Sequence, residues 1–156
     1  MFEAIARLFG AESAPANAPL APRVAVAALL VHLATVDGRA KPEEVRVISH
    51  ALKDHYGLDD GAVARLIEEA RRKDREAVDF YQFTSRLSRL ERDEKIDIIR
   101  MMWQVVFADD TNHELEDNMV WRVAELIGVS ARERTVLRNQ MRRGIHAESD
   151  TGETEK

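Results

Sequence analysis

Four acidic residues stand at matching places in two similar stretches of the chain. Asp37 follows an apolar stretch, and Glu44 comes seven positions later. Asp109 and Glu116 repeat this spacing, each 72 residues after its counterpart. Carboxylate oxygens are the ligands that hard cations such as calcium, magnesium and manganese prefer. These four residues are therefore candidate ligands of a divalent cation.

Further donor groups flank the four acids and could complete a coordination shell. They are Glu43, Asp110, Asn112, His113 and Asp117. The sequence leaves open whether the two acidic turns form one shared site, two separate sites or no site. Antiparallel packing of the preceding helices would place the turns at opposite ends, whereas a more parallel crossing would bring them together. Mutual repulsion of converging carboxylates would then raise some of their pKa values unless a cation intervened.

A purely structural role accounts for the same residues. Asp37 and Asp109 can accept hydrogen bonds from turn amides. Glu44 and Glu116 stand near the third position of a predicted helix, where a carboxylate satisfies free N–H groups and the helix dipole. The capping role and the metal role are compatible, and both stay open.

Motifs that would indicate catalysis or a more specific metal site do not occur. Neither turn has the ligand spacing of an EF-hand. No histidine has Glu three residues before it, as di-iron bundles require, and there is no phosphate loop or nucleophile elbow. We therefore expect a non-catalytic protein. A metal-dependent hydrolase is the weakest alternative, since it needs a concave pocket around the carboxylates.

The sequence around these acids has the pattern of helices. Apolar residues recur with helical period, and no stretch alternates with period two. The pattern predicts a central helix at residues 23–36 that is apolar nearly all round, a second at 42–56, and another at 78–90. The later part repeats the first two. We predict an all-α domain of six to seven helices with internal pseudo-twofold duplication.

Several residues mark the ends of the predicted helices. Gly57 and Gly128 are expected to end the second helix of each copy. Asp59 or Asp60 is expected to cap the next helix of the first copy, and Ser130 that of the second. Between these helices, residues 71–76 (RRKDRE) are interpreted as a charged connection.

The repeated pattern resembles the TerB-like family, which is named after a tellurite resistance protein and is related to the N-terminal domain of DjlA-type co-chaperones. The resemblance is carried by residues 36–44 (VDGRAKPEE) and by residues 107–110 (FADD) with Glu116. It covers roughly residues 23–143. Departures are Asp110 in place of a Gly, and Lys41 or His113 in place of Ser or Thr. The resemblance implies a divalent-ion or protein-binding module with a link to tellurite resistance or stress response.

Composition narrows the remaining classes of protein. The net charge of −5 gives no basic field to attract nucleic acid. The absence of cysteine excludes disulfides and thiolate metal sites. The longest apolar stretch is too short to span a membrane, and the N-terminus lacks the apolar region of a secretory signal. We expect a cytoplasmic protein.

The domain prediction has four parts. Residues 1–9 form an amphipathic helix whose Phe2, Ile5 and Phe9 could bind this domain, a protein partner or a membrane surface. Residues 10–22 form an Ala/Pro-rich linker, residues 23–144 the TerB-like domain, and residues 145–156 a disordered acidic tail.

The last helix offers a second surface for partners. Arg134, Arg138 and Arg142 stand four residues apart and should form a basic stripe. The alternative to metal binding is therefore an interaction adaptor with structural acidic turns, which docks through this stripe or the N-terminal segment. His32 is interpreted as a hydrogen-bonded residue of the core or a groove, and Trp103 as core.

Overall fold

The computed structural model describes residues 20–36, 38, 40–108 and 114–154. The predicted N-terminal helix and most of the linker lie outside these residues. No strand occurs in the described part of the chain, so the all-α prediction is confirmed. The helices are α2 (Pro22–Thr35), α3 (Pro42–Tyr56), α4 (Asp60–Glu76), α5 (Tyr81–Leu87), α6 (Arg92–Val106), α7 (Glu114–Ile127) and α8 (Ala131–Thr154).

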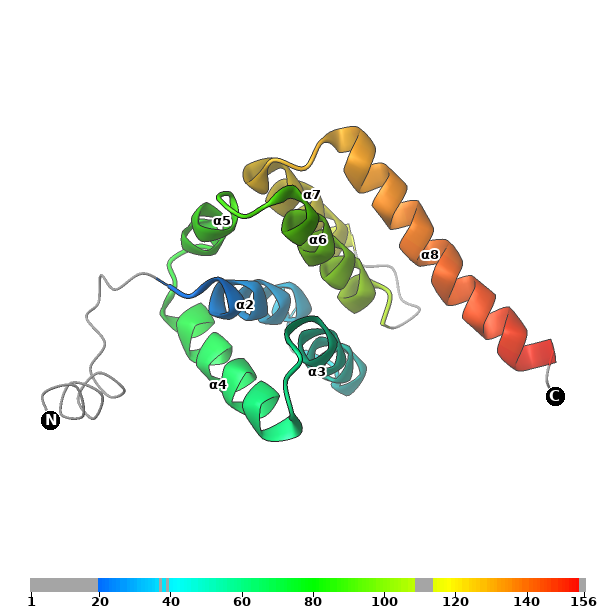
Figure 1. The fold of residues 1–156 in the computed structure, drawn as a ribbon, viewed down its shortest axis with the longest axis horizontal. Helices are drawn as coiled ribbons and strands as arrows, with labels where there is room; N and C mark the ends of the chain where they lie inside the picture. Colours follow the sequence, from blue (N-terminus) through cyan, green and yellow to red (C-terminus); the bar gives the residue numbers. More distant parts are fainter. Residues whose placement is uncertain (1–19, 37, 39, 109–113, 155–156) are drawn as a thin grey trace, which may run out of the picture.

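Helix α2 is the centre of the domain. From Val24 to Ala34 every side chain except that of His32 is buried, as expected for a helix that is apolar on all sides. It packs against α3, α4, α5, α6 and α7 (Figure 1). Burying each Leu or Val side chain contributes about 1.5–3 kcal/mol, so this one helix supplies a large share of the hydrophobic stabilisation.

The two halves of the domain use the same set of helix contacts. In the first half α2 packs on α3 and α4, which also touch each other; in the second half α6 packs likewise on α7 and α8. The halves meet where α2 contacts α6, and there α3 packs on α6 while α7 packs on α2. The second helix of each half thus packs on the central helix of the other half, as a pseudo-twofold arrangement requires. Helix α5 joins the halves and packs on α2 and α7.

Two predicted helix starts are confirmed, and at each of them a side chain caps the helix. The Asp59 carboxylate accepts a hydrogen bond from the Ala62 N–H at 2.7 Å and caps α4. The Ser130 hydroxyl accepts from the Glu133 N–H at 3.2 Å, while the Glu133 carboxylate accepts from the Ser130 N–H at 3.3 Å. This reciprocal pair is a capping box at the start of α8.

Three boundaries differ from the prediction. Helix α4 continues through residues 71–76, because a charged stretch without Pro or Gly suits an exposed helical turn. Helix α5 is shorter than the predicted 78–90, and Val78 is fully exposed rather than part of an apolar stripe. Helix α8 runs on to Thr154, where a disordered tail was predicted from residue 145, since a helix already anchored extends at little cost.

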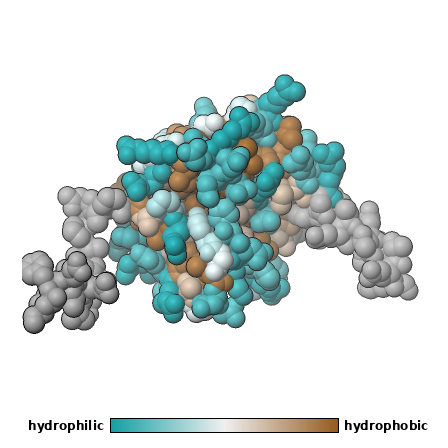
Figure 2. All heavy atoms as spheres, viewed as in Figure 1, coloured by the Kyte–Doolittle hydropathy of each residue, from teal (hydrophilic) through white to brown (hydrophobic). Residues whose placement is uncertain are grey.

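The surface is dominated by polar residues. Figure 2 shows hydrophilic residues covering most of one face, with hydrophobic residues exposed in narrow stretches between them. None of the described helices is both long and apolar enough to cross a membrane. In Figure 1 the C-terminal part of α8 projects beyond the rest of the bundle.

Gly57 offers a direct test of how the second helix ends. Its φ is +64°, a left-handed conformation, and a Cβ would meet no atom within 4 Å. Gly57→Ala should therefore lower the free energy of unfolding by about 1 kcal/mol through backbone strain alone. Urea denaturation measures this change.

Gly61 provides the matched control for that substitution. It lies inside α4, and its added Cβ would meet only the tip of the Arg65 side chain at 3.4 Å and Asp59 at 3.6 Å. Gly61→Ala should raise stability by about 0.5 kcal/mol, because Ala favours the helix. Equal effects of the two substitutions would contradict this account.

Candidate functional site

Glu44 is a buried acid at the third position of α3. Its side chain is 1% exposed, and one carboxylate oxygen accepts a hydrogen bond from the Lys41 N–H at 3.1 Å. This contact is half of a capping box, with Pro42 at the first helical position. The predicted capping role of Glu44 is thus present in the structure.

Glu116 occupies the equivalent position of α7, and its side chain is 0% exposed. Taking a carboxylate out of water costs several kcal/mol unless a partner compensates its charge. A solvent-exposed capping Glu would avoid that cost. Both copies of the repeat nevertheless bury this acid, and capping by itself does not require burial.

The described ends of α2 and α6 each lie beside a helix of the other half. Val36, at the end of α2, lines one pocket with Leu115 and Met119 from the first turns of α7. Phe107 and Ala108, after α6, line another pocket with residues 46–47 near the start of α3. Each central helix therefore ends beside the beginning of the other half's second helix, which is the more parallel of the two arrangements considered from the sequence (Figure 1).

Of the remaining candidate ligands, the structure describes some and leaves others outside the described residues. Glu43 is exposed beside Glu44, and Asp117 forms an ion pair with Arg138 at 3.0 Å. Within the described ranges no three His, Asp or Glu side chains gather closely enough to hold a metal ion. Candidates outside the described residues are Asp37, Asp109, Asp110, Asn112 and His113, and likewise Phe2, Ile5 and Phe9 of the N-terminal segment.

The arginine stripe of α8 is engaged within the domain. Arg134 donates to the Trp121 carbonyl at 2.8 Å, and its guanidinium lies 4.6 Å from the centre of the Trp121 ring. Arg138 pairs with Asp117 and lies 5.3 Å from the centre of the buried Trp103 ring. These two residues fasten α8 to α6 and α7, and of the stripe only Arg142 is exposed.

Arg138 should therefore matter for stability. Arg138→Ala removes a half-buried ion pair and a cation–π contact, and we expect it to lower the free energy of unfolding by about 1–2 kcal/mol. Arg142→Ala is the control on the same helix and should change stability by less than about 0.5 kcal/mol. Urea denaturation of both variants checks this, and similar losses would show that Arg138 is not an anchor.

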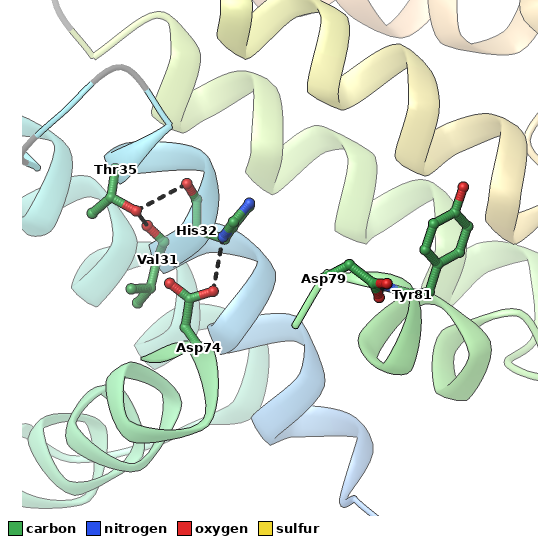
Figure 3. A network of polar contacts seen from close by, with 6 residues as sticks. All are labelled: Val31, His32, Thr35, Asp74, Asp79 and Tyr81. Carbon is green, nitrogen blue, oxygen red and sulfur yellow. Dashed lines mark hydrogen bonds and ion pairs between the residues drawn. The ribbon is translucent and has the colours of Figure 1, made fainter. Parts of the chain in front are cut away.

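His32 connects α2 to α4 through a contact that no sequence pattern predicts. Its Nδ1 lies 2.8 Å from an Asp74 carboxylate oxygen, across 42 residues of sequence (Figure 3). The Phe80 ring lies against the imidazole, with 5.8 Å between ring centroids. The hydrogen bond with Asp74 raises the pKa of His32 above its ordinary value of 6.5, partial burial opposes the rise, and the Asp74 charge adds to it. The groove interpretation of His32 is confirmed; its partner was missed.

The raised pKa of His32 makes the α2–α4 contact depend on pH. The protonated pair contributes its full stabilisation below pH of about 6.5, the unfolded value, and loses it as the pH rises through the folded-state value. The free energy of unfolding lost in Asp74→Asn should therefore be larger at pH of about 5.5 than at pH of about 8.5.

Urea denaturation at the two pH values measures that difference. Asp54→Asn, which removes an exposed carboxylate from α3, is the control and should show no such trend. A constant loss in Asp74→Asn across the range would contradict a charged His32–Asp74 pair.

Comparison with known proteins agrees with the repeated acidic pattern. The family described as "Tellurite resistance protein TerB" matches residues 23–139, from the start of α2 into α8. No curated protein and no solved structure matches the chain significantly. The family match spans both halves of the domain and includes both buried glutamates. The chain belongs to the TerB family.

Proposed function

We propose that this TerB-family domain is a non-catalytic module that binds a divalent cation through its paired acidic turns. The observation that carries the proposal is the burial of Glu44 and Glu116 at equivalent positions of the two repeats. Each copy thus holds a carboxylate at the same place beside its acidic turn, and carboxylate oxygens are the ligands that hard divalent cations prefer. The donor set fits such an ion, because its four principal members are all carboxylates.

One shared site is the form of this proposal that the fold favours. The ends of α2 and α6 lie beside the first turns of α7 and α3, which supports a site shared by the two turns. Asp37 and Asp109 would join Glu44 and Glu116 as ligands. Glu43, Asp110, Asn112 and His113 are auxiliary candidates; Asp117 is a weaker one, because Arg138 already pairs with it.

A bound cation would supply positive charge between the two halves and fix the turns against each other. The turns and their cation would then form a rigid surface for a protein partner, and we include such a partner in the proposal. A role in tellurite resistance or a wider stress response is also part of it, on the strength of the family description alone.

The alternative function is an interaction adaptor that binds no metal. It would dock through the N-terminal segment, to a protein or a membrane surface, or through the arginine stripe. Arg134 and Arg138 contact Trp121 and Asp117 within the domain, which leaves little of the stripe for a partner. This observation favours the acidic turns as the functional surface.

Calorimetric titration with calcium, magnesium and manganese tests the metal role. We expect the wild-type chain to bind at least one of these ions with a stoichiometry of one per chain, and the ion to raise the melting temperature, because it binds only the folded state. Asp37→Ala/Asp109→Ala should abolish both effects. A stoichiometry of two would indicate separate sites.

Glu44→Gln/Glu116→Gln keeps the size of the two buried side chains while removing their charge. It should weaken cation binding at least about tenfold, as loss of a charged ligand from a site does. Glu43→Gln, which changes the exposed neighbour, is the matched control and should bind as wild type does. Absence of binding by the wild type to all three ions would eliminate the metal role and leave the adaptor.

A further inference from the structure

A second concave region lies between α2, α3 and α4, and we call it the α2–α3–α4 pocket. Its volume is about 430 Å³, within the range of small-molecule sites. The floor is apolar and draws on all three helices. It consists of Val31 and Ala34 of α2, Val45 and Ile48 of α3, and Ile67 of α4.

The polar groups at the rim fall into two kinds. The Thr35 hydroxyl donates to the Val31 and His32 carbonyls, each at 3.1 Å, and Asp74 is held by His32 (Figure 3). These groups are satisfied within the fold. Arg71 and Arg75 also line the pocket. Neither guanidinium group forms a hydrogen bond or an ion pair with any of the residues that the structure describes.

Arg71 and Arg75 are placed to act together. Residues four apart share one face of a helix, so the two guanidinium groups border the same pocket from α4. Guanidinium binds carboxylate through two parallel hydrogen bonds, which an ammonium cannot reproduce. Among the described residues that line the pocket, Asp74 is the one acid, and it pairs with His32. The described lining therefore combines an apolar floor with two guanidinium groups that pair with no acid in it.

We propose that the α2–α3–α4 pocket binds an aliphatic carboxylate. The hydrocarbon chain lies on the floor formed by the three helices, and the carboxylate is held by Arg71 and Arg75. An alcohol of the same chain length would gain the apolar contacts without the ion pairs. Acetate would gain the ion pairs without the apolar contacts. The pocket borders the first acidic turn, because Gly38 and Ala40 also line it. The proposed contacts with the carboxylate ligand do not require a bound cation.

Calorimetric titration of the full-length chain with octanoate tests the proposal, with 1-octanol and acetate as matched probes. We expect one octanoate per chain, with octanol and acetate each binding at least about tenfold more weakly. Arg71→Gln/Arg75→Gln should weaken octanoate about tenfold and leave octanol unchanged. Arg72→Gln, an exposed neighbour on α4 that does not line the pocket, should bind octanoate as wild type does.

A second variant locates the hydrocarbon chain. Val45→Phe adds bulk to the half-buried part of the floor and should weaken octanoate and octanol alike, while circular dichroism confirms that the helices are intact. Equal binding of octanoate and octanol, or octanoate binding untouched by Arg71→Gln/Arg75→Gln, would overturn the proposal. So would binding that appears only in Phe2→Asp/Phe9→Asp, because the chain's own N-terminal segment would then be the occupant.

Discussion

The burial of α2 on every side dictates how the other helices are arranged around it. A helix without a polar face cannot lie on the surface of a protein in water, so several others must cover it. Here α3, α4, α5, α6 and α7 do so. The second central helix, α6, is covered less completely, and α8 closes its outer side. The arrangement of the helices follows from the need to bury the apolar surfaces of α2 and α6.

The same arrangement buries one acid in each half of the domain. Because α3 packs on α6 and α7 on α2, the third residue of each second helix is drawn into the interior. That residue is an acid in both copies, Glu44 and Glu116. A capping bond from the Lys41 N–H accounts for one oxygen of Glu44, but a neutral Gln could accept it too. The proposed cation would account for a charged residue at both positions.

The ends of the helices could be predicted because they rest on contacts between near neighbours in sequence. Asp59 and Ser130 cap helices through amides three residues away, and Gly57 ends α3 through its own φ. The extent of α4 and α5 could not be predicted in the same way. The charged residues 71–76 suit either a loop or a helix, and α5 is short because only Phe83, Thr84 and Leu87 find places in the interior.

Period and spacing along the chain were enough to predict the helical class, the duplication and the matched positions of Asp37 with Glu44 and of Asp109 with Glu116. Contacts between side chains of distant segments, in contrast, emerged only from the folded arrangement of the helices. His32 finds Asp74 after 42 residues, and Arg138 finds Asp117 after 21. Arg71 and Arg75, which read as part of a charged connection, come to border an apolar pocket. Such contacts depend on the angles at which helices cross. Packing of the whole core sets those angles, and no local sequence pattern encodes them.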